Sequence, residues 1–312
     1  MSLRMHCRMS PPVFPPHPKH LYLERVREVH TIDMGALDVK TRWAGAAHVE
    51  VYCGPDVLLI DPYCSRPGKM EILTQPLRPR IGKIRSFLNG IGGTVRAIAV
   101  GHTHFDHSLD APEIARLTHA AVLGSSSLAT LFELSGLPGV VTVCQPHDPV
   151  DIGQSMRVTM IPSRHGRILG KFFLMEGEID RRRRLPLRAH RYRLGSMFAV
   201  HVRTGGISIL HVGSAGFKAE ELESVRCDIL FLCVSGWKGT PGYPQMVIDL
   251  VRPSCVVPIH HDDFTVPIGG DGGCRILRSA DLDGFMKRVR AGFPGVEIRV
   301  LPPQADITIT GG

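Results

Sequence analysis

The stretch "GHTHFDHSLD", residues 101–110, places His102, His104, Asp106 and His107 within six positions, directly after the apolar run "VRAIAV". The two histidines nearest that predicted strand are two residues apart, so their side chains leave the same face. Imidazole nitrogens and carboxylate oxygens are typical zinc ligands. The pattern H-x-H-x-D-H therefore predicts a metal site, or two adjacent ones. A polar loop that is merely rich in histidine is the alternative.

Two later strand ends carry further histidines. "VTMIPSRHG" ends with His165, and "CVVPIHHDDF" contains His260 and His261. An α/β fold collects its functional groups where strands give way to loops. Adjacent side chains at a strand exit point to opposite sides. We therefore expect only one of His260 and His261 to face a metal, and the other to line the pocket or cap a turn.

The elements that position these residues alternate along the chain. Short apolar runs such as "VLLID" and "CDILFLCV" predict buried strands, and segments such as "RIGKIRSFLN" and "SADLDGFMKRVRAG" predict helices. In "DAPEIARLTH" we expect Asp110 to cap the helix, with Glu113 completing a capping box. Strands with helices between them at both ends predict an α/β fold, in which two mixed sheets covered by helices form a four-layer αββα sandwich.

The domain organisation predicted from composition is simple. Residues 1–20 hold five prolines and predict an extended arm, and residues 21–312 predict a single domain. Within it, residues 176–193 hold seven arginines against three acidic residues, which is +4 of the net charge of +8. We expect this segment to be an arginine-rich insertion.

Composition indicates a soluble globular protein, with 43% apolar and 21% charged residues. No apolar run approaches the roughly 20 residues that span a bilayer, and the N-terminal sequence has no apolar core typical of a signal peptide. The eight cysteines show no paired spacing. We therefore expect free thiols and a cytoplasmic protein without a transmembrane segment.

Five motifs occur in an order that resembles the metallo-β-lactamase superfamily: "LLIDP", "GHTHFDH", "IPSRH", "LHVGSAG" and "PIHHDDF". Together they cover roughly residues 40 to 265. The Ile-Asp-Pro, the "GSAG" and the last motif look most like the branch of L-ascorbate-6-phosphate lactonase-like and N-acylphosphatidylethanolamine phospholipase D-like hydrolases. The resemblance implies the four-layer fold and a metal-dependent hydrolase.

Carried over residue by residue, the resemblance implies two metal sites and a supporting carboxylate. The first site would be formed by His102, His104 and His165, and the second by Asp106, His107 and His260. Asp61, at a strand end, would brace the ligand loop without touching metal, since ligating imidazoles need an acceptor on their other nitrogen.

The sequence departs from the family at one position. Many members have a Gly-Asp pair whose aspartate bridges two metals, and here the pair is Gly213-Ser214. A neutral hydroxyl is a poor substitute for a bridging carboxylate, so we expect one or two ions, with Ser214 supporting the site or simply completing a turn. Zinc is the expected metal, with manganese or iron as alternatives.

The function predicted from these residues is hydrolysis by a metal-activated water, which Asp106 would orient or deprotonate. The resemblance implies an ester, lactone or phosphodiester substrate. Arginine side chains favour an anionic small molecule, so Arg181 and Arg182 are candidate substrate contacts, and His261 is another. Trp237, in a glycine-rich loop after a predicted strand, is a candidate pocket wall or else a surface anchor.

Three other functions remain open: a nucleic-acid-processing member of the superfamily, a non-catalytic metal- or ligand-binding member, and an oxidative iron enzyme. Against nucleic acid as a partner, the positive charge is local and only 6% of the residues are aromatic. The oligomeric state is not predicted.

Overall fold

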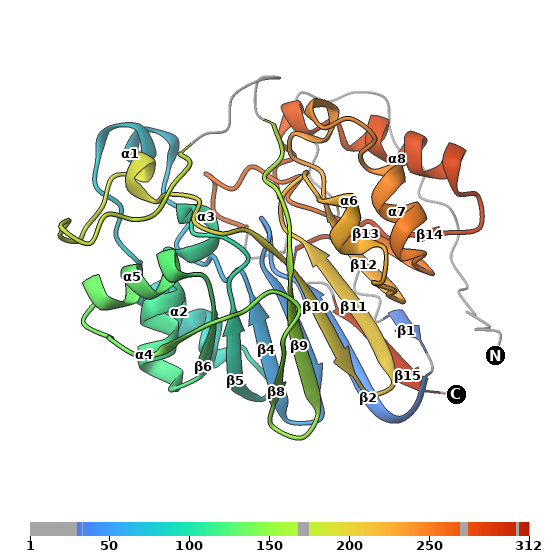
Figure 1. The fold of residues 1–312 in the computed structure, drawn as a ribbon, viewed down its shortest axis with the longest axis horizontal. Helices are drawn as coiled ribbons and strands as arrows, with labels where there is room; N and C mark the ends of the chain where they lie inside the picture. The colour runs from blue at the N-terminus through green and yellow to red at the C-terminus, as the bar shows by residue number, and fades with distance from the viewer. Residues whose placement is uncertain (1–29, 33, 168–174, 269–273, 304–305, 312) are drawn as a thin grey trace.

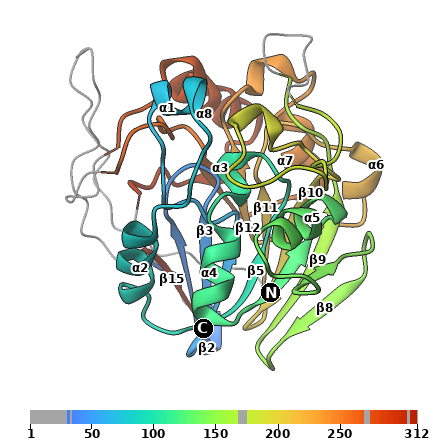
Figure 2. The same ribbon diagram turned by 90° about the vertical axis from the view of Figure 1, so that its left-hand side faces the viewer.

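The computed structural model describes residues 30–32, 34–167, 175–268, 274–303 and 306–311. The proline-rich arm at 1–20 lies outside these ranges. So does nearly all of the apolar run "GKFFLM", residues 170–175, which predicts a strand. In the described part, two sheets lie face to face and helices cover their outer faces (Figures 1 and 2). The predicted four-layer sandwich is therefore confirmed.

The first sheet has eight strands and carries the histidine-rich motif at its parallel half. Strands β2, β3 and β4 pair antiparallel, whereas β4, β5, β6 and β7 run parallel. In spatial order the strands are β1 (His30–Ile32), β15 (Asp306–Gly311), β2 (Met34–Trp43), β3 (Val49–Cys53), β4 (Asp56–Ile60), β5 (Thr94–Ala99), β6 (Ala121–Gly124) and β7 (Val141–Val143).

The second sheet has seven strands and is also mixed. Its parallel half comprises β14, β13, β12 and β11, and the remaining strands pair antiparallel. In spatial order the strands are β14 (Glu297–Ile298), β13 (Cys255–Ile259), β12 (Ile229–Cys233), β11 (Ile207–Val212), β10 (Phe198–Thr204), β9 (Met156–Pro162) and β8 (Pro149–Ile152).

Helices cover each sheet on its outer side. Over the first sheet lie α1 (Lys69–Thr74), α2 (Ile81–Asn89), α3 (Phe105–Ser108), α4 (Ala111–Thr118) and α5 (Ser126–Leu134). Over the second lie α6 (Ala219–Leu222), α7 (Gln245–Val251) and α8 (Leu282–Gly292). Three short 3-10 turns complete the described elements: η1 (Ala189–Arg191), η2 (Trp237–Gly239) and η3 (Arg278–Ala280).

Apolar side chains fill the three spaces between these four layers. One core lies between the sheets and joins residues such as Val51 of β3 to Val200 of β10. A second joins the first sheet to α2, α4 and α5, and a third joins the second sheet to α7 and α8. Strands buried on both faces explain why "VLLI" and "ILFLC" are continuous apolar runs in the sequence.

The expected capping box at α4 does not form. Asp110 is the N-cap residue, but its side chain makes no cap hydrogen bond, and Glu113 instead bonds Arg116 at 2.8 Å. The Asp110 carboxylate accepts the backbone N–H groups of Cys64 and Ser65 at 2.6 and 2.7 Å. A tertiary contact to the loop after β4 has replaced the local cap, since that loop also needs its buried N–H groups satisfied.

Two predictions from the sequence concern membrane-spanning segments and the state of the cysteines. None of the described helices combines the length and apolar character that a bilayer crossing requires. The seven cysteines in the described ranges are free thiols, and six of them are buried.

Candidate metal centre

The histidine-rich loop follows β5, which lies between β4 and β6 in the first sheet. At the end of β4 stands Asp61, fully buried, whose carboxylate accepts the Gly101 N–H at 2.7 Å. A Cβ at Gly101 would lie 2.9 Å from the Phe198 carbonyl oxygen of the second sheet. The ligand loop therefore leaves the sheet through a gap that only glycine fits, and Asp61 fixes its first turn.

Two further contacts hold the loop between β5 and α3. The Thr103 N–H donates to the Leu194 carbonyl at 3.0 Å, and the Thr103 hydroxyl lies 2.9 Å from the Ser127 hydroxyl. α3 begins directly after His104, so Asp106 and His107 stand in its single turn. The sharp change from strand to helix brings all four ligand candidates to one place.

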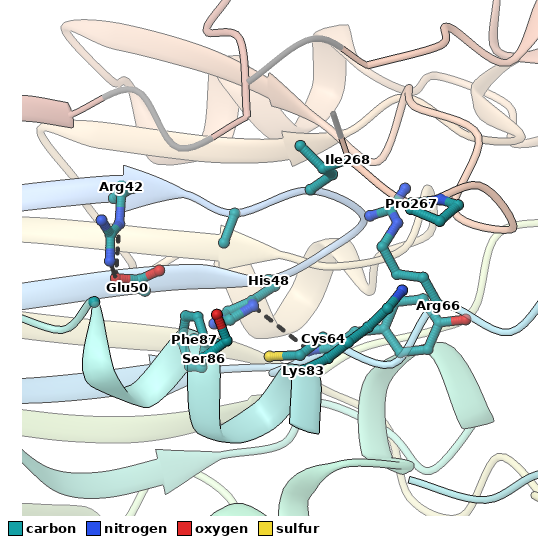
Figure 3. A pocket seen from close by; sticks show the side chains of 13 residues that line it. Arg42, His48, Glu50, Cys64, Arg66, Lys83, Ser86, Phe87, Pro267 and Ile268 are labelled. Carbon is teal, nitrogen blue, oxygen red and sulfur yellow. Dashed lines mark hydrogen bonds and ion pairs between the residues drawn. The ribbon is translucent and has the colours of Figure 1, made fainter. Parts of the chain in front are cut away.

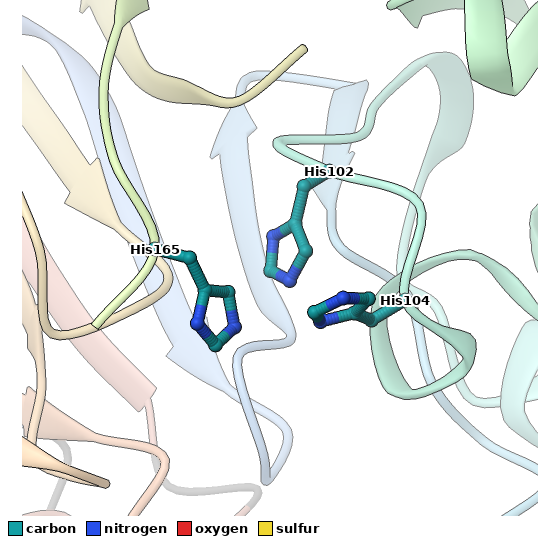
Figure 4. Close-up of side chains that lie close together, drawn as sticks. All are labelled: His102, His104 and His165. Carbon is teal, nitrogen blue, oxygen red and sulfur yellow. The ribbon is translucent and has the colours of Figure 1, made fainter. Parts of the chain in front are cut away.

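The first ligand group consists of His102, His104 and His165 (Figure 4). One nitrogen from each ring lies within 4.8 Å of the others. The first two rings come from the loop after β5, and the third comes from the segment after β9. This group contains no carboxylate.

The second ligand group consists of Asp106, His107 and His260, with ligand atoms again within 4.8 Å of one another. The Asp106 Oδ2 lies 3.2 Å from His260 Nε2 and 3.7 Å from His107 Nε2. The rings of His102 and His107 are 3.8 Å apart between centroids, so the two groups are adjacent. His260 has a left-handed backbone, with φ +56°, and its N–H donates to the Ala46 carbonyl at 2.9 Å.

Burial and neighbouring charges set the protonation of these side chains. Burial lowers the pKa of His102 well below its ordinary value, and lowers that of His165 to about 4. Burial also disfavours a charged Asp106, but the neighbouring His107 and His260 outweigh it and lower the pKa of the carboxyl overall. For His107, burial lowers the pKa and the Asp61 and Asp106 carboxylates raise it, with a net rise.

Two ligand imidazoles have their second nitrogen engaged by the protein. His107 Nδ1 lies 2.8 Å from Asp61 Oδ2, and His165 Nδ1 lies 2.8 Å from the Gly166 carbonyl. Each acceptor fixes the hydrogen on Nδ1 and leaves the lone pair on Nε2. Asp61 therefore lies where the sequence predicted a bracing carboxylate.

Ser214 contacts the loop that carries His165. Its hydroxyl accepts the Gly166 N–H at 3.0 Å, and it is buried. A Cβ at Gly166 would lie 2.8 Å from the Ala215 carbonyl, and one at Gly216 would clash with the Arg164 carbonyl. The "GSAG" segment thus packs backbone to backbone against the His165 loop, and Ser214 supports that ligand.

The donor set fits a divalent metal ion. Both ring nitrogens of His102 are buried without a hydrogen-bond partner among the described residues. Such an arrangement costs free energy unless something else satisfies the nitrogens. Imidazole lone pairs with one carboxylate match the preferences of zinc, and also suit iron and manganese.

The remaining predicted residues lie elsewhere. The His261 ring stacks against Trp43, with centroids 4.5 Å apart, and belongs to neither ligand group. Trp237 is a core residue and not the expected pocket wall, because it is buried in the apolar layer under α8 and its indole N–H donates to the Ala280 carbonyl. Arg181 and Arg182 are exposed, and Arg181 pairs with Glu133 of α5 at 3.7 Å.

Sequence comparison agrees with this geometry. A family described as "Beta-lactamase superfamily domain" matches residues 42–260, which include all six ligand candidates. The chain belongs to the metallo-β-lactamase superfamily. The family match, together with relatives that are named metal-dependent hydrolases, confirms the prediction of a metal-dependent hydrolase.

Individual relatives are distant. A UPF0173 metal-dependent hydrolase of Anaeromyxobacter dehalogenans is 26% identical over 84% of this chain and 83% of its own length. Another, from Thermococcus onnurineus, is 23% identical over 75% of this chain and 88% of its own length. The solved structure of Igni18, a metallo hydrolase from Ignicoccus hospitalis, has a TM-score of 0.59 and 18% identity over 87% of this chain and 98% of that one. That structure bears on the fold alone.

Proposed function

We propose that the two ligand groups form the active centre of a hydrolase that cleaves an ester, lactone or phosphodiester bond in an anionic small molecule. This substrate range corresponds to the lactonase-like and phospholipase D-like branch that the motifs resemble. The observation that carries the proposal is the pairing of a three-imidazole group with an adjacent group that contains Asp106. The first group offers only imidazole ligands, and the second adds an anionic carboxylate to its two imidazoles.

Asp106 is the proposed catalytic residue. A divalent ion held by these groups supplies Lewis acidity and lowers the pKa of a water bound to it. The lowered pKa of Asp106 keeps its carboxylate ionised, so it accepts a hydrogen bond from water and orients it. A carboxylate of such low basicity is better suited to orienting water than to keeping its proton.

The proposed metal is zinc, in one or two ions, with manganese or iron as alternatives that share the same ligand types. The proposed compartment is the cytoplasm, where the free thiols of the described residues stay reduced. The anionic character of the substrate rests on the arginine-rich segment, whose last residue, Arg193, accepts a hydrogen bond from Thr103 through its carbonyl. That contact places the end of the segment beside the ligand loop.

The decisive experiment compares metal content and turnover in one preparation. We expect the variant H102A/H104A to lose bound metal and at least roughly a thousandfold in turnover, since metal activation contributes several kcal/mol. Elemental analysis of protein purified without added metal identifies the ion and its stoichiometry. A panel of anionic and neutral esters, lactones and phosphodiesters identifies the bond.

The matched control is H190A, because His190 is exposed and belongs to neither ligand group. It should retain metal and turnover within a factor of about two. Full turnover in metal-free H102A/H104A protein would overturn the proposal.

A further inference from the structure

A polar cavity lies between α2 and the loop after β13 (Figure 3). Its volume is about 440 Å³, and it is lined by residues from four separate segments of the chain. Lys83, Ser86 and Phe87 of α2 face Pro267 and Ile268 across it. We call this cavity the Arg66 pocket, and none of the six ligand candidates lines it.

Arg66 lines this pocket and has a buried donor without a hydrogen-bond partner. Its side chain is only 4% exposed, and its Nε donates to the Val266 carbonyl at 2.7 Å. Its Nη2 binds Asp262 and the Asp263 carbonyl, whereas Nη1 has no hydrogen-bond partner among the described residues. Gly45, at φ +94°, makes room for this nitrogen, because a Cβ there would lie 2.7 Å from Nη1.

His48 supplies a second unsatisfied donor. It is 1% exposed, and its Nδ1 faces the Tyr63 N–H at 3.5 Å, the contact drawn in Figure 3. Burial, together with Arg42, lowers the pKa of His48 to about 3, so the ring is neutral. Since Nδ1 accepts, the hydrogen is on Nε2. That N–H has no hydrogen-bond partner among the described residues, although the ring meets Phe87 at a steep angle with centroids 5.0 Å apart.

Lys83 adds a cation. Its ammonium donates to the Ser65 carbonyl at 3.3 Å, which leaves two of its three N–H groups available. The acidic side chain that lines the pocket, Glu50, is already paired with Arg42 at 2.5 Å. Arg66 is likewise paired with Asp262, so Lys83 gives the pocket lining a positive excess.

Donors without hydrogen-bond partners, on residues that line one cavity together with a cation, favour an anion with several acceptor oxygens. We propose that the Arg66 pocket is a binding site for a small oxyanion, a carboxylate or a phosphate, held by Arg66 Nη1, His48 Nε2 and Lys83 Nζ. Phe87 and Ile268 provide apolar walls for the rest of such a ligand. The pocket is separate from the metal ligands but linked to them, because Asp262, the partner of Arg66, also accepts the Ala46 N–H, and Ala46 accepts that of His260.

Calorimetric titration of the full-length protein with inorganic phosphate tests this site. The titration is run with and without prior chelation of metal, at constant ionic strength, and repeated with acetate. We expect saturable binding of at least one of the two anions, retained in chelated protein, and the tighter one identifies the ligand's acidic group.

Lys83→Gln should weaken that binding roughly tenfold, because it removes a charge-assisted hydrogen bond. Arg85→Gln is the matched control: it removes one positive charge from an exposed position of the same helix and should leave the dissociation constant unchanged within twofold. Thermal unfolding of each variant confirms that it is folded.

Three outcomes would overturn the proposal: no saturable binding of either anion, equal dissociation constants for Lys83→Gln and the unaltered protein, or binding that disappears on chelation. The last would place the anion on the metal centre. Because the test is read in metal-free protein, its failure is distinct from failure of the proposed hydrolase activity.

Discussion

The metal centre and the Arg66 pocket both bury imidazoles, yet they suit ligands of opposite charge. In the metal centre, His107 and His165 direct their N–H groups outward to Asp61 and the Gly166 carbonyl, so lone pairs converge. In the Arg66 pocket, His48 accepts on Nδ1, and its remaining N–H has no hydrogen-bond partner in a cavity that Arg66 and Lys83 also line. The hydrogen-bond partner of one ring nitrogen therefore decides whether a buried histidine offers a lone pair to a cation or an N–H to an anion.

Removing the acceptor behind His107 should give the largest effect short of removing a metal ligand itself. Asp61→Asn replaces a carboxylate that accepts from both His107 and Gly101 by an amide that can present an N–H to one of them. We expect metal affinity or turnover to fall 10- to 100-fold, the usual cost of losing such a partner. Metal titration of chelated protein, followed by turnover of the reloaded enzyme, measures it.

Asp110→Asn is the matched control, because Asp110 is also a fully buried carboxylate but bonds Cys64 and Ser65. It should lower the melting temperature without changing metal affinity. Equal losses of metal affinity in both variants would show that Asp61 acts only through overall stability.

Much of the metal centre could be predicted from the sequence because its residues follow apolar strands. The "HTHFDH" motif is local, and His165 and His260 each close a strand that the sequence marks clearly. The alternation of side chains at a strand exit predicted that only one of His260 and His261 faces the metal, and the resemblance to the family favoured His260. At a strand end, one short stretch of sequence contains both the apolar run that marks the strand and the polar residues that bind a ligand.

Tertiary contacts were not predictable in this way. Asp110 has the spacing of a helix cap but bonds a loop about 45 residues earlier. Trp237 follows a strand in a glycine-rich loop, the usual setting of a pocket wall, but α8 packs over it. The donors of the Arg66 pocket come from separate segments with no motif, so only the folded chain brings Arg66, His48 and Lys83 together.

A smaller effect is expected from restoring the missing carboxylate. Ser214→Asp keeps an acceptor for the Gly166 N–H and adds a negative charge where many relatives of the resembled family have a bridging aspartate. We expect the weaker of two metal-binding steps to tighten by about tenfold, or a second ion to become measurable, since a second carboxylate offsets more cationic charge. Ions per chain and stepwise affinities are read by calorimetry and elemental analysis.

Ser214→Asn is the neutral control, with a similar volume and an acceptor oxygen but no charge. If it tightened metal binding as much as Ser214→Asp, charge would not be the cause. Unchanged stoichiometry in both variants would mean that position 214 does not reach the metal.

The smallest expected effect is the contribution of His48, in the Arg66 pocket, to the loss of stability at acid pH. The pKa of His48 is about 3 in the folded protein, against an ordinary value of 6.5, so below pH 6.5 the unfolded chain binds a proton that the folded chain does not. The free energy of unfolding therefore falls as the pH is lowered from 6.5 toward 3.

In chelated protein, where loss of metal cannot contribute, His48→Gln removes this titration. The melting temperature of the His48→Gln variant minus that of the unaltered protein should rise by a few °C as the pH is lowered from 7 to 4.5. His201, whose pKa burial lowers to about 4 outside both sites, titrates in both proteins and cancels in that difference. A difference in melting temperature that stays constant with pH would show that folding does not shift the pKa of His48. The folded ring would then be protonated below its ordinary pKa of 6.5 and would not be a neutral N–H donor there.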